Sequence, residues 1–170
     1  FQRGQFAGDA RVFGLTSEGN EVAWKGYAAV SAAKVALEAT ARSIAAEFGL
    51  KVTVGAWIDK NADRNKREIE AAITLAKRNS NVNGIVVGNE TIYRGEQKVE
   101  DLIDLIKRVK KSVNVPVTTG EIWNIWRDNP ELASSVDFIA AHVLPYWENF
   151  TSKQAVDQAV AMFQLLREQF

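Results

Sequence analysis

The sequence predicts an α/β protein with a parallel sheet of about five strand-then-helix units. Short apolar stretches rich in β-branched residues alternate with amphipathic helical patterns along the chain. Polar and aromatic residues collect where the predicted strands end. Alternating strands and helices imply a parallel sheet joined by right-handed crossovers. The chain therefore reads as roughly (βα)5.

Five stretches have the composition of buried strands, with continuous apolar runs of four to seven residues. They span residues 12–15, 52–58, 84–87, 115–119 and 138–144.

Apolar residues at helical spacing follow the strands and predict the helices that connect them. Ser152 stands where a side chain could cap the last helix. The predicted buried stripes are Ile69, Ala72, Ile73 and Ala76; Val99, Leu102, Ile103, Ile106 and Val109; and Val156, Ala159, Val160 and Phe163.

Composition indicates one folded domain over residues 1–170 and excludes several classes of function. With 21 basic and 21 acidic residues there is no positive field of the kind that draws proteins onto nucleic acid. No apolar run reaches the roughly 20 residues of a membrane span, and residues 1–10 lack the order of a signal peptide. The absence of cysteine is compatible with any cellular compartment. The absence of an initiating Met suggests a cut or processed chain.

Carboxylates and aromatic rings recur at the ends of successive strands, where α/β proteins bind ligands. Aromatic faces beside acids, without clusters of Lys or Arg, suit the apolar face and the hydroxyls of a sugar. The predicted ligand is therefore a carbohydrate. The candidates that line its site are Trp57, Asp59, Asn89, Glu90, Glu121, Trp123, His142, Tyr146 and Trp147.

Glu90 is the first candidate for a catalytic acid. Glycoside hydrolysis usually needs one protonated and one ionised carboxyl group, and Glu90 follows a strand directly. Its neighbour Asn89 could bond the sugar 2-hydroxyl. The alternative is that Glu90 is a solvated loop acid, because surface carboxylates can imitate catalytic ones.

Four motifs in order resemble bacterial glycoside hydrolases of family 17, which act on β-1,3-glucan. They are AAEFGLKVTVGAW at 45–57, VVGNE at 86–90, VTTGEIW at 117–123 and VDFIAAHVLPYWE at 136–148. The resemblance covers residues 45–170 and implies a partial (β/α)8 TIM barrel. It also implies that Glu90 is the acid/base, that Asn89 contacts sugar, and that Trp57, Glu121, Trp123, His142, Tyr146 and Trp147 line the cleft.

The family's nucleophilic glutamate follows its seventh strand, and the sequence ends at Phe170 after the helix that follows strand six. An incomplete active site is therefore expected. Glu121 and Glu148 are the available second carboxylates, and a retaining enzyme needs its pair about 5 to 5.5 Å apart. Binding of a β-glucan oligosaccharide is better supported than its hydrolysis.

Residues 8–48 resemble instead a segment of short-chain dehydrogenases of the enoyl-acyl-carrier-protein reductase type. Tyr27 and Lys34 match the spacing of that family's tyrosine and lysine. We favour an ordinary amphipathic helix, in which Tyr27 and Lys34 have no catalytic role, because no glycine-rich turn is present to hold a nicotinamide cofactor. The two resemblances together suggest a chimera, with a catalytically inert α/β scaffold and a reductase fragment as alternative functions.

Five units cannot close an eight-stranded barrel. The exposed sheet edges are therefore expected to be covered, to pair in a homodimer, or to be rearranged into an open doubly wound sheet. No cofactor is implied. No metal site is expected either, since His142 is the one histidine in the sequence. We expect it to act as a hydrogen-bonding residue.

Overall fold

The computed structural model describes residues 25, 26 and 28–170. The predicted strand at 12–15 and Tyr27 lie outside these residues, as does the side chain of Lys34. The described elements, in chain order, are α1 (Ala28–Phe48), β1 (Val52–Ala56), α2 (Ala62–Arg78), β2 (Val82–Asn89), α3 (Val99–Lys110), β3 (Val117–Ile122), α4 (Trp123–Asp128), α5 (Pro130–Ser135), β4 (Ala140–His142), the 3-10 helix η2 (Pro145–Glu148) and α6 (Ser152–Gln169).

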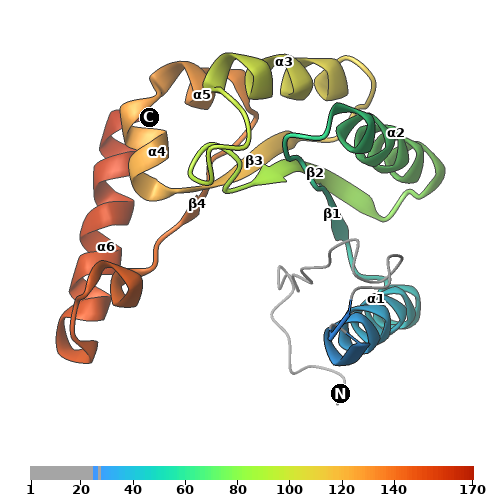
Figure 1. Cartoon of the computed structure of the whole chain (residues 1–170), viewed down its shortest axis with the longest axis horizontal. Coiled ribbons are helices and arrows are strands. Elements are labelled where there is room, and N and C mark those ends of the chain that lie inside the picture. The colour runs from blue at the N-terminus through green and yellow to red at the C-terminus, as the bar shows by residue number, and fades with distance from the viewer. Residues whose placement is uncertain (1–24, 27) are drawn as a thin grey trace.

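The described strands form one parallel sheet in the order β1-β2-β3-β4 (Figure 1). Neighbours in sequence are neighbours in the sheet, as in a segment of a (β/α)8 barrel. A doubly wound sheet would reverse its order at a switch point. The predicted parallel α/β class is confirmed, and the doubly wound arrangement is not the one that these residues adopt.

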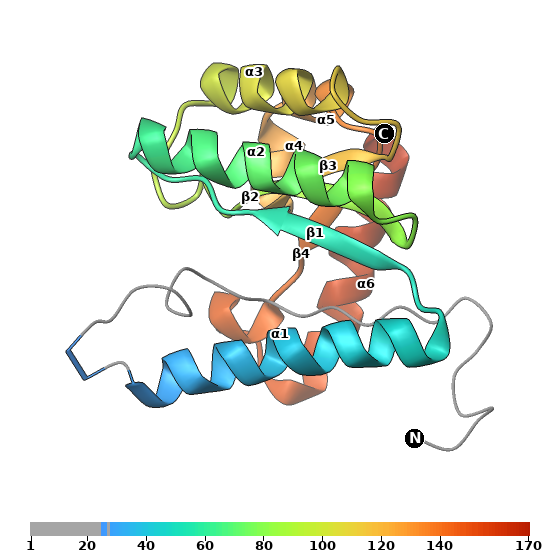
Figure 2. The same cartoon turned by 90° about the vertical axis from the view of Figure 1, so that its right-hand side faces the viewer.

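Helices α2, α3 and α5 lie on one side of the sheet, and α1 lies on the opposite side of β1 from α2 (Figure 2). The core lies between the sheet and its helices. The stripe predicted for α3 is confirmed, because Leu102, Ile106 and Val109 are fully buried. Ile69 and Ala72 of α2 are buried in the same core.

Local signals set where the helices begin. The side chain of Asn61 caps α2 by accepting a hydrogen bond from the backbone N–H of Arg64 at 3.0 Å. Pro130 opens α5, where its missing N–H costs nothing. The prediction for α6 is wrong by one residue, because Thr151 is the cap and Gln154 Oε1 accepts from its backbone N–H at 3.2 Å.

The predicted buried stripe of α6 is also wrong. Val156 is 71% exposed and Phe163 is 61% exposed, whereas Met162 and Leu166 are buried. The physical reason is that α6 packs against α4 and η2, which turns a different face of the helix inward. Within the part of the chain that the structure describes, no helix is long and apolar enough to span a bilayer.

Candidate active site at the strand ends

Three neighbouring strands bring a small group of side chains together at their carboxyl ends. In the pairing of the strands, Asn89 of β2 lies beside Gly120 of β3. Gly120 pairs in turn with Ala140 of β4, two residues before His142. We call Asn89, Glu90, Gly120 and His142 the strand-end cluster.

Glu90 and His142 are in direct contact. The imidazole Nδ1 lies 2.7 Å from Glu90 Oε1, and both side chains remain partly accessible, at 31% for His142 and 24% for Glu90. The two residues are 52 positions apart in sequence. The parallel register of β2, β3 and β4 is therefore what creates the pair.

The backbone at Glu90 is unusual. Its φ of 53° lies in the left-handed region, which non-glycine residues seldom enter and which often marks a functional position. Gly88, two residues earlier, has a φ of 84°, and the register of β2 against β3 shifts between Val86 and Asn89. Such irregularities bend a strand and redirect its side chains. The Glu90 N–H donates to the Gly120 carbonyl at 2.6 Å, which fixes the bend.

Gly120 is required because the cluster is crowded. A β-carbon at this position would lie 3.1 Å from His142 Nε2 and 3.4 Å from Asn89 Oδ1. Any larger residue would have to push the imidazole or the amide aside. The motif at 117–123 thus contributes Gly120, whose lack of a side chain leaves room for His142 and Asn89, as well as Glu121.

Glu121 is not the exposed rim acid that the sequence suggested. It is fully buried, and its carboxylate accepts hydrogen bonds from the backbone N–H groups of Ile92 at 2.7 Å and Tyr93 at 3.4 Å. Burial raises its pKa above 4.5, the two N–H groups oppose that rise, and the nearby charge of Glu90 adds to it. Glu121 therefore holds the turn that follows Glu90.

Asp59 is likewise engaged locally, beside the start of α2. Its carboxylate forms an ion pair with Arg64 at 2.5 Å and accepts from the Asn61 N–H at 2.7 Å. Its backbone N–H and carbonyl both bond the side chain of Asn65. These contacts show that Asp59 stabilises the loop between β1 and α2.

The aromatic candidates fall into two groups. Trp57 and Trp123 each have one ring face covered, by Arg94 at 4.4 Å and by Arg127 at 4.9 Å. Tyr146 and Trp147 are 81% and 78% exposed on η2 and pack edge to face. The second pair is the one that offers an open aromatic surface to solvent.

Glu148 follows this aromatic pair and is partnered by Trp123. The indole Nε1–H of Trp123 donates to Glu148 Oε1 at 2.7 Å. The bond ties η2 to the end of β3, so that the aromatic surface is joined to the neighbouring strand end.

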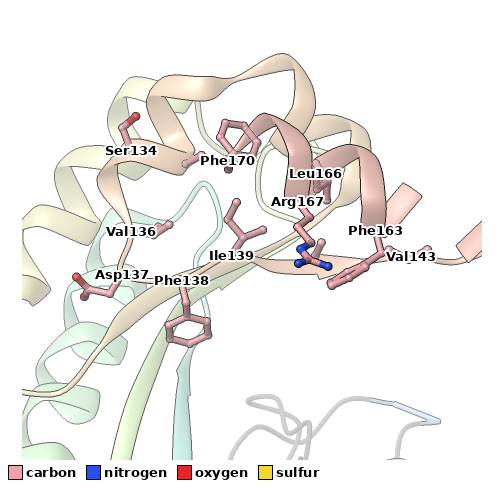
Figure 3. Close-up of a pocket in the computed structure, with 12 residues that line it drawn as sticks. Ser134, Val136, Asp137, Phe138, Ile139, Val143, Phe163, Leu166, Arg167 and Phe170 are labelled. Carbon is pink, nitrogen blue, oxygen red and sulfur yellow. The ribbon is translucent and has the colours of Figure 1, made fainter. Parts of the chain in front are cut away.

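A hollow of about 790 Å³ is lined by residues from the segment 133–143 and from α6 (Figure 3). Ala141 and Val143 line it, and because side chains alternate along a strand they point away from the side that His142 occupies. Phe138, Ile139, Phe163 and Phe170 are among its apolar lining residues. The hollow is therefore a gap between β4 and α6, separate from the strand-end cluster.

Comparison with known proteins identifies the family. The family described as the BtgE/BtgC glycoside hydrolase domain matches residues 19–170. The chain belongs to this family. The match begins upstream of Tyr27 and covers residues 19–48 of the segment that resembled a reductase, and nothing supports the chimera.

The relatives agree with this assignment and are much longer. The protein named probable glucan endo-1,3-beta-glucosidase btgC of Aspergillus fumigatus is 32% identical over 124 residues, which are 66% of this chain and 17% of that protein. A glycoside hydrolase family 17 beta-1,3-glucanosyltransferase from Rhizomucor miehei aligns with a TM-score of 0.66 and 28% identity, over 75% of this chain and 49% of its own. An active-site mutant of the Rhizomucor miehei enzyme with laminaritriose gives a TM-score of 0.65 at 28% identity, over 84% and 53%. The family 17 resemblance is confirmed.

One residue of the site was missed by sequence reasoning. Arg94 lies four positions after Glu90 and contacts the ends of both β1 and β2. An arginine in the loop after the acid is the signal that the sequence gives, and solvated loop arginines look the same.

Proposed function

We propose that this chain carries the acid/base half of a glucan-active site, in which Glu90 is the general acid/base and Asn89 contacts the sugar. The substrate is a β-1,3-glucan oligosaccharide, and the reaction is hydrolysis or transglycosylation. The observation that carries the proposal is the bond between Glu90 and His142 at the convergence of three strand ends.

His142 suits both protonation states of an acid/base. A neutral imidazole has one donor and one acceptor nitrogen, and its tautomers exchange these roles. When Glu90 is ionised, Nδ1–H donates to the carboxylate. When Glu90 is protonated, its O–H donates to the bare Nδ1. The contact at 2.7 Å is kept in both states when the imidazole exchanges its proton between Nδ1 and Nε2 through solvent, as Glu90 gives up its proton to the leaving oxygen and regains one.

Sugar rings are proposed to lie on the exposed pair Tyr146 and Trp147, with Trp57, Trp123 and His142 bordering the cleft. The open faces of the pair suit an uncharged polyhydroxylated ligand. Laminaritriose is the ligand of choice for testing, because the Rhizomucor miehei mutant was captured with it.

The test compares the wild-type chain with Glu90→Gln and with Glu131→Gln, a surface control on α5. General acid/base catalysis contributes about 10²- to 10⁴-fold. Turnover of β-1,3-gluco-oligosaccharides should fall by that factor in Glu90→Gln only. Where the wild type has no turnover, tryptophan fluorescence should still report saturable laminaritriose binding that Tyr146→Ala or Trp147→Ala weakens.

The rival is a catalytically inert α/β scaffold. It predicts that Glu90→Gln alters neither turnover nor binding. Absence of both turnover and laminaritriose binding in the folded wild-type chain would refute the glucan proposal and favour this rival.

We also propose that two copies of the chain associate through their sheet edges. In the described part, β1 and β4 each pair on one side only, and α6 exposes Val156 and Phe163. Unpaired edges and exposed apolar side chains favour association. Light scattering should give twice 18.8 kDa, and Phe163→Glu should return it to the single mass. A wild-type mass of one chain would refute this proposal.

A further inference from the structure

Arg94 joins the ends of two strands. It lies in the loop between β2 and α3, and its guanidinium donates hydrogen bonds to two carbonyl oxygens. One belongs to Asn89, at the end of β2. The other belongs to Ile58, two residues after β1, at 3.3 Å. The side chain thus bridges the peptide immediately before Glu90 and the segment that carries Trp57.

The same guanidinium lies over the indole of Trp57. Its central carbon is 4.4 Å from the ring centroid, within the range of a cation–π contact. One face of Trp57 is covered in this way, and the ring plane is set by the cation. Trp57 can therefore present only its other face or its edge to a ligand.

The loop around Arg94 is itself well anchored. The Arg94 N–H donates to the Glu90 carbonyl at 2.8 Å, and the two preceding N–H groups bond the buried carboxylate of Glu121. Glu96 lies 3.8 Å from Arg94 Nε and balances part of the charge. The loop thus fixes the position of the guanidinium, which in turn contacts the Asn89 and Ile58 carbonyls and the Trp57 ring.

We infer that Arg94 is a positioning residue of the site, which fixes the Asn89–Glu90 peptide and the Trp57 ring. This inference rests on the proposed function for its effect on glucan. Arg94 acts through its neighbours and has no assigned contact with substrate. An arginine is needed because its planar fork of donors can reach two carbonyls and stack on a ring at once, whereas a lysine nitrogen is a single point of charge.

The experiment uses Arg94→Lys and Arg94→Met, with Arg108→Met as the matched control. Arg108 lies on α3, is half exposed and pairs with Glu70 at 3.7 Å, so its loss removes an arginine and an ion pair away from the cluster. Thermal unfolding establishes that each variant is folded. Amide and indole N–H spectra of the labelled chain then report the surroundings of Glu90 and Trp57, the Trp57 signal being assigned with Trp57→Phe.

Both Arg94 variants should move the Trp57 indole and Glu90 amide signals, and Arg108→Met should leave both in place. Laminaritriose affinity, or kcat where there is turnover, should fall about tenfold or more in Arg94→Met, as expected when a charged hydrogen-bonding group is lost. Lysine should not restore it. A purely structural role would lower the unfolding temperature and leave these values unchanged in the folded chain.

The two proposals fail in different ways. Unmoved Trp57 and Glu90 signals in Arg94→Met, or wild-type affinity in Arg94→Lys, would refute the positioning role. A folded wild-type chain with neither laminaritriose binding nor turnover would refute the proposed function, and the spectra alone would then decide whether Arg94 holds the two strand ends.

Discussion

Replacing Gly120 with alanine should disturb the strand-end cluster far more than it disturbs the fold. The new β-carbon would lie 3.1 Å from His142 Nε2 and 3.4 Å from Asn89 Oδ1. The first distance is tighter than ordinary van der Waals contact, so the imidazole must move by a few tenths of an ångström. That movement acts directly on the 2.7 Å bond between His142 and Glu90.

The change in stability is a difference between two effects. Alanine restricts the unfolded chain and can stabilise a protein by about 0.4–1 kcal/mol where its backbone is compatible. Crowding a packed site costs about 1–3 kcal/mol. Because His142 is partly exposed and can yield, a cost near the lower limit is expected. The net loss should be no more than about 0.6 kcal/mol, or up to about 2 °C in Tm for a chain of this size.

Gly84→Ala is the matched control. Gly84 lies in β2, and a β-carbon there would meet Pro116 and Thr53 at 3.5 Å, which is ordinary contact. It should therefore be neutral or stabilising. The assay is denaturant unfolding combined with the imidazole signals of His142, which is the one histidine in the sequence. Unchanged imidazole signals in Gly120→Ala, or equal stability of the two variants, would show that Gly120 does not hold space for the cluster.

Three further outcomes can be measured by unfolding. Burial raises the pKa of Glu121, so the folded state binds its proton more tightly than the unfolded state; the stability advantage of the wild type over Glu121→Gln should shrink as pH rises above 4.5, and a constant difference would contradict this. Leu102→Ala should cost about 2–5 kcal/mol in urea unfolding, whereas Leu75→Ala, half exposed on α2, should cost much less. Asn61→Ala should lose about 1 kcal/mol by removing the cap of α2, and an unchanged midpoint would show that the cap is dispensable.

Periodicity in the sequence was sufficient for α3, which packs against β2, β3 and α5. The stripe of α3 was predicted from spacing alone and is buried, because a helix that covers a parallel sheet turns a single apolar face inward. The same reasoning failed for α6, whose contacts are with α4 and η2. Its spacing admits more than one apolar face, and tertiary contacts decide that Met162 and Leu166 are the buried ones.

The chemistry of the site was only partly visible in the sequence. Strand ends could be predicted, so Asn89, Glu90 and His142 were expected on one edge of the sheet. Their contacts could not, because the bond between Glu90 and His142 depends on the register of three strands and on a left-handed residue. Arg94 was missed for a similar reason, since its role arises from where a loop places a long side chain.

Glu121 shows why the second acid of a glucan-cleaving pair is not simply another nearby carboxylate. A retaining pair stands about 5 to 5.5 Å apart, with its nucleophile free to attack the sugar. Glu121 is buried and accepts the N–H groups of Ile92 and Tyr93. Losing an ordinary hydrogen bond costs about 0.5–1.5 kcal/mol, so turning Glu121 toward a sugar would cost about 1–3 kcal/mol for the two bonds and would loosen the turn after Glu90. Glu121 therefore holds the turn that follows Glu90. Under the proposed function, the nucleophile that works with Glu90 would be a carboxylate without such a structural role.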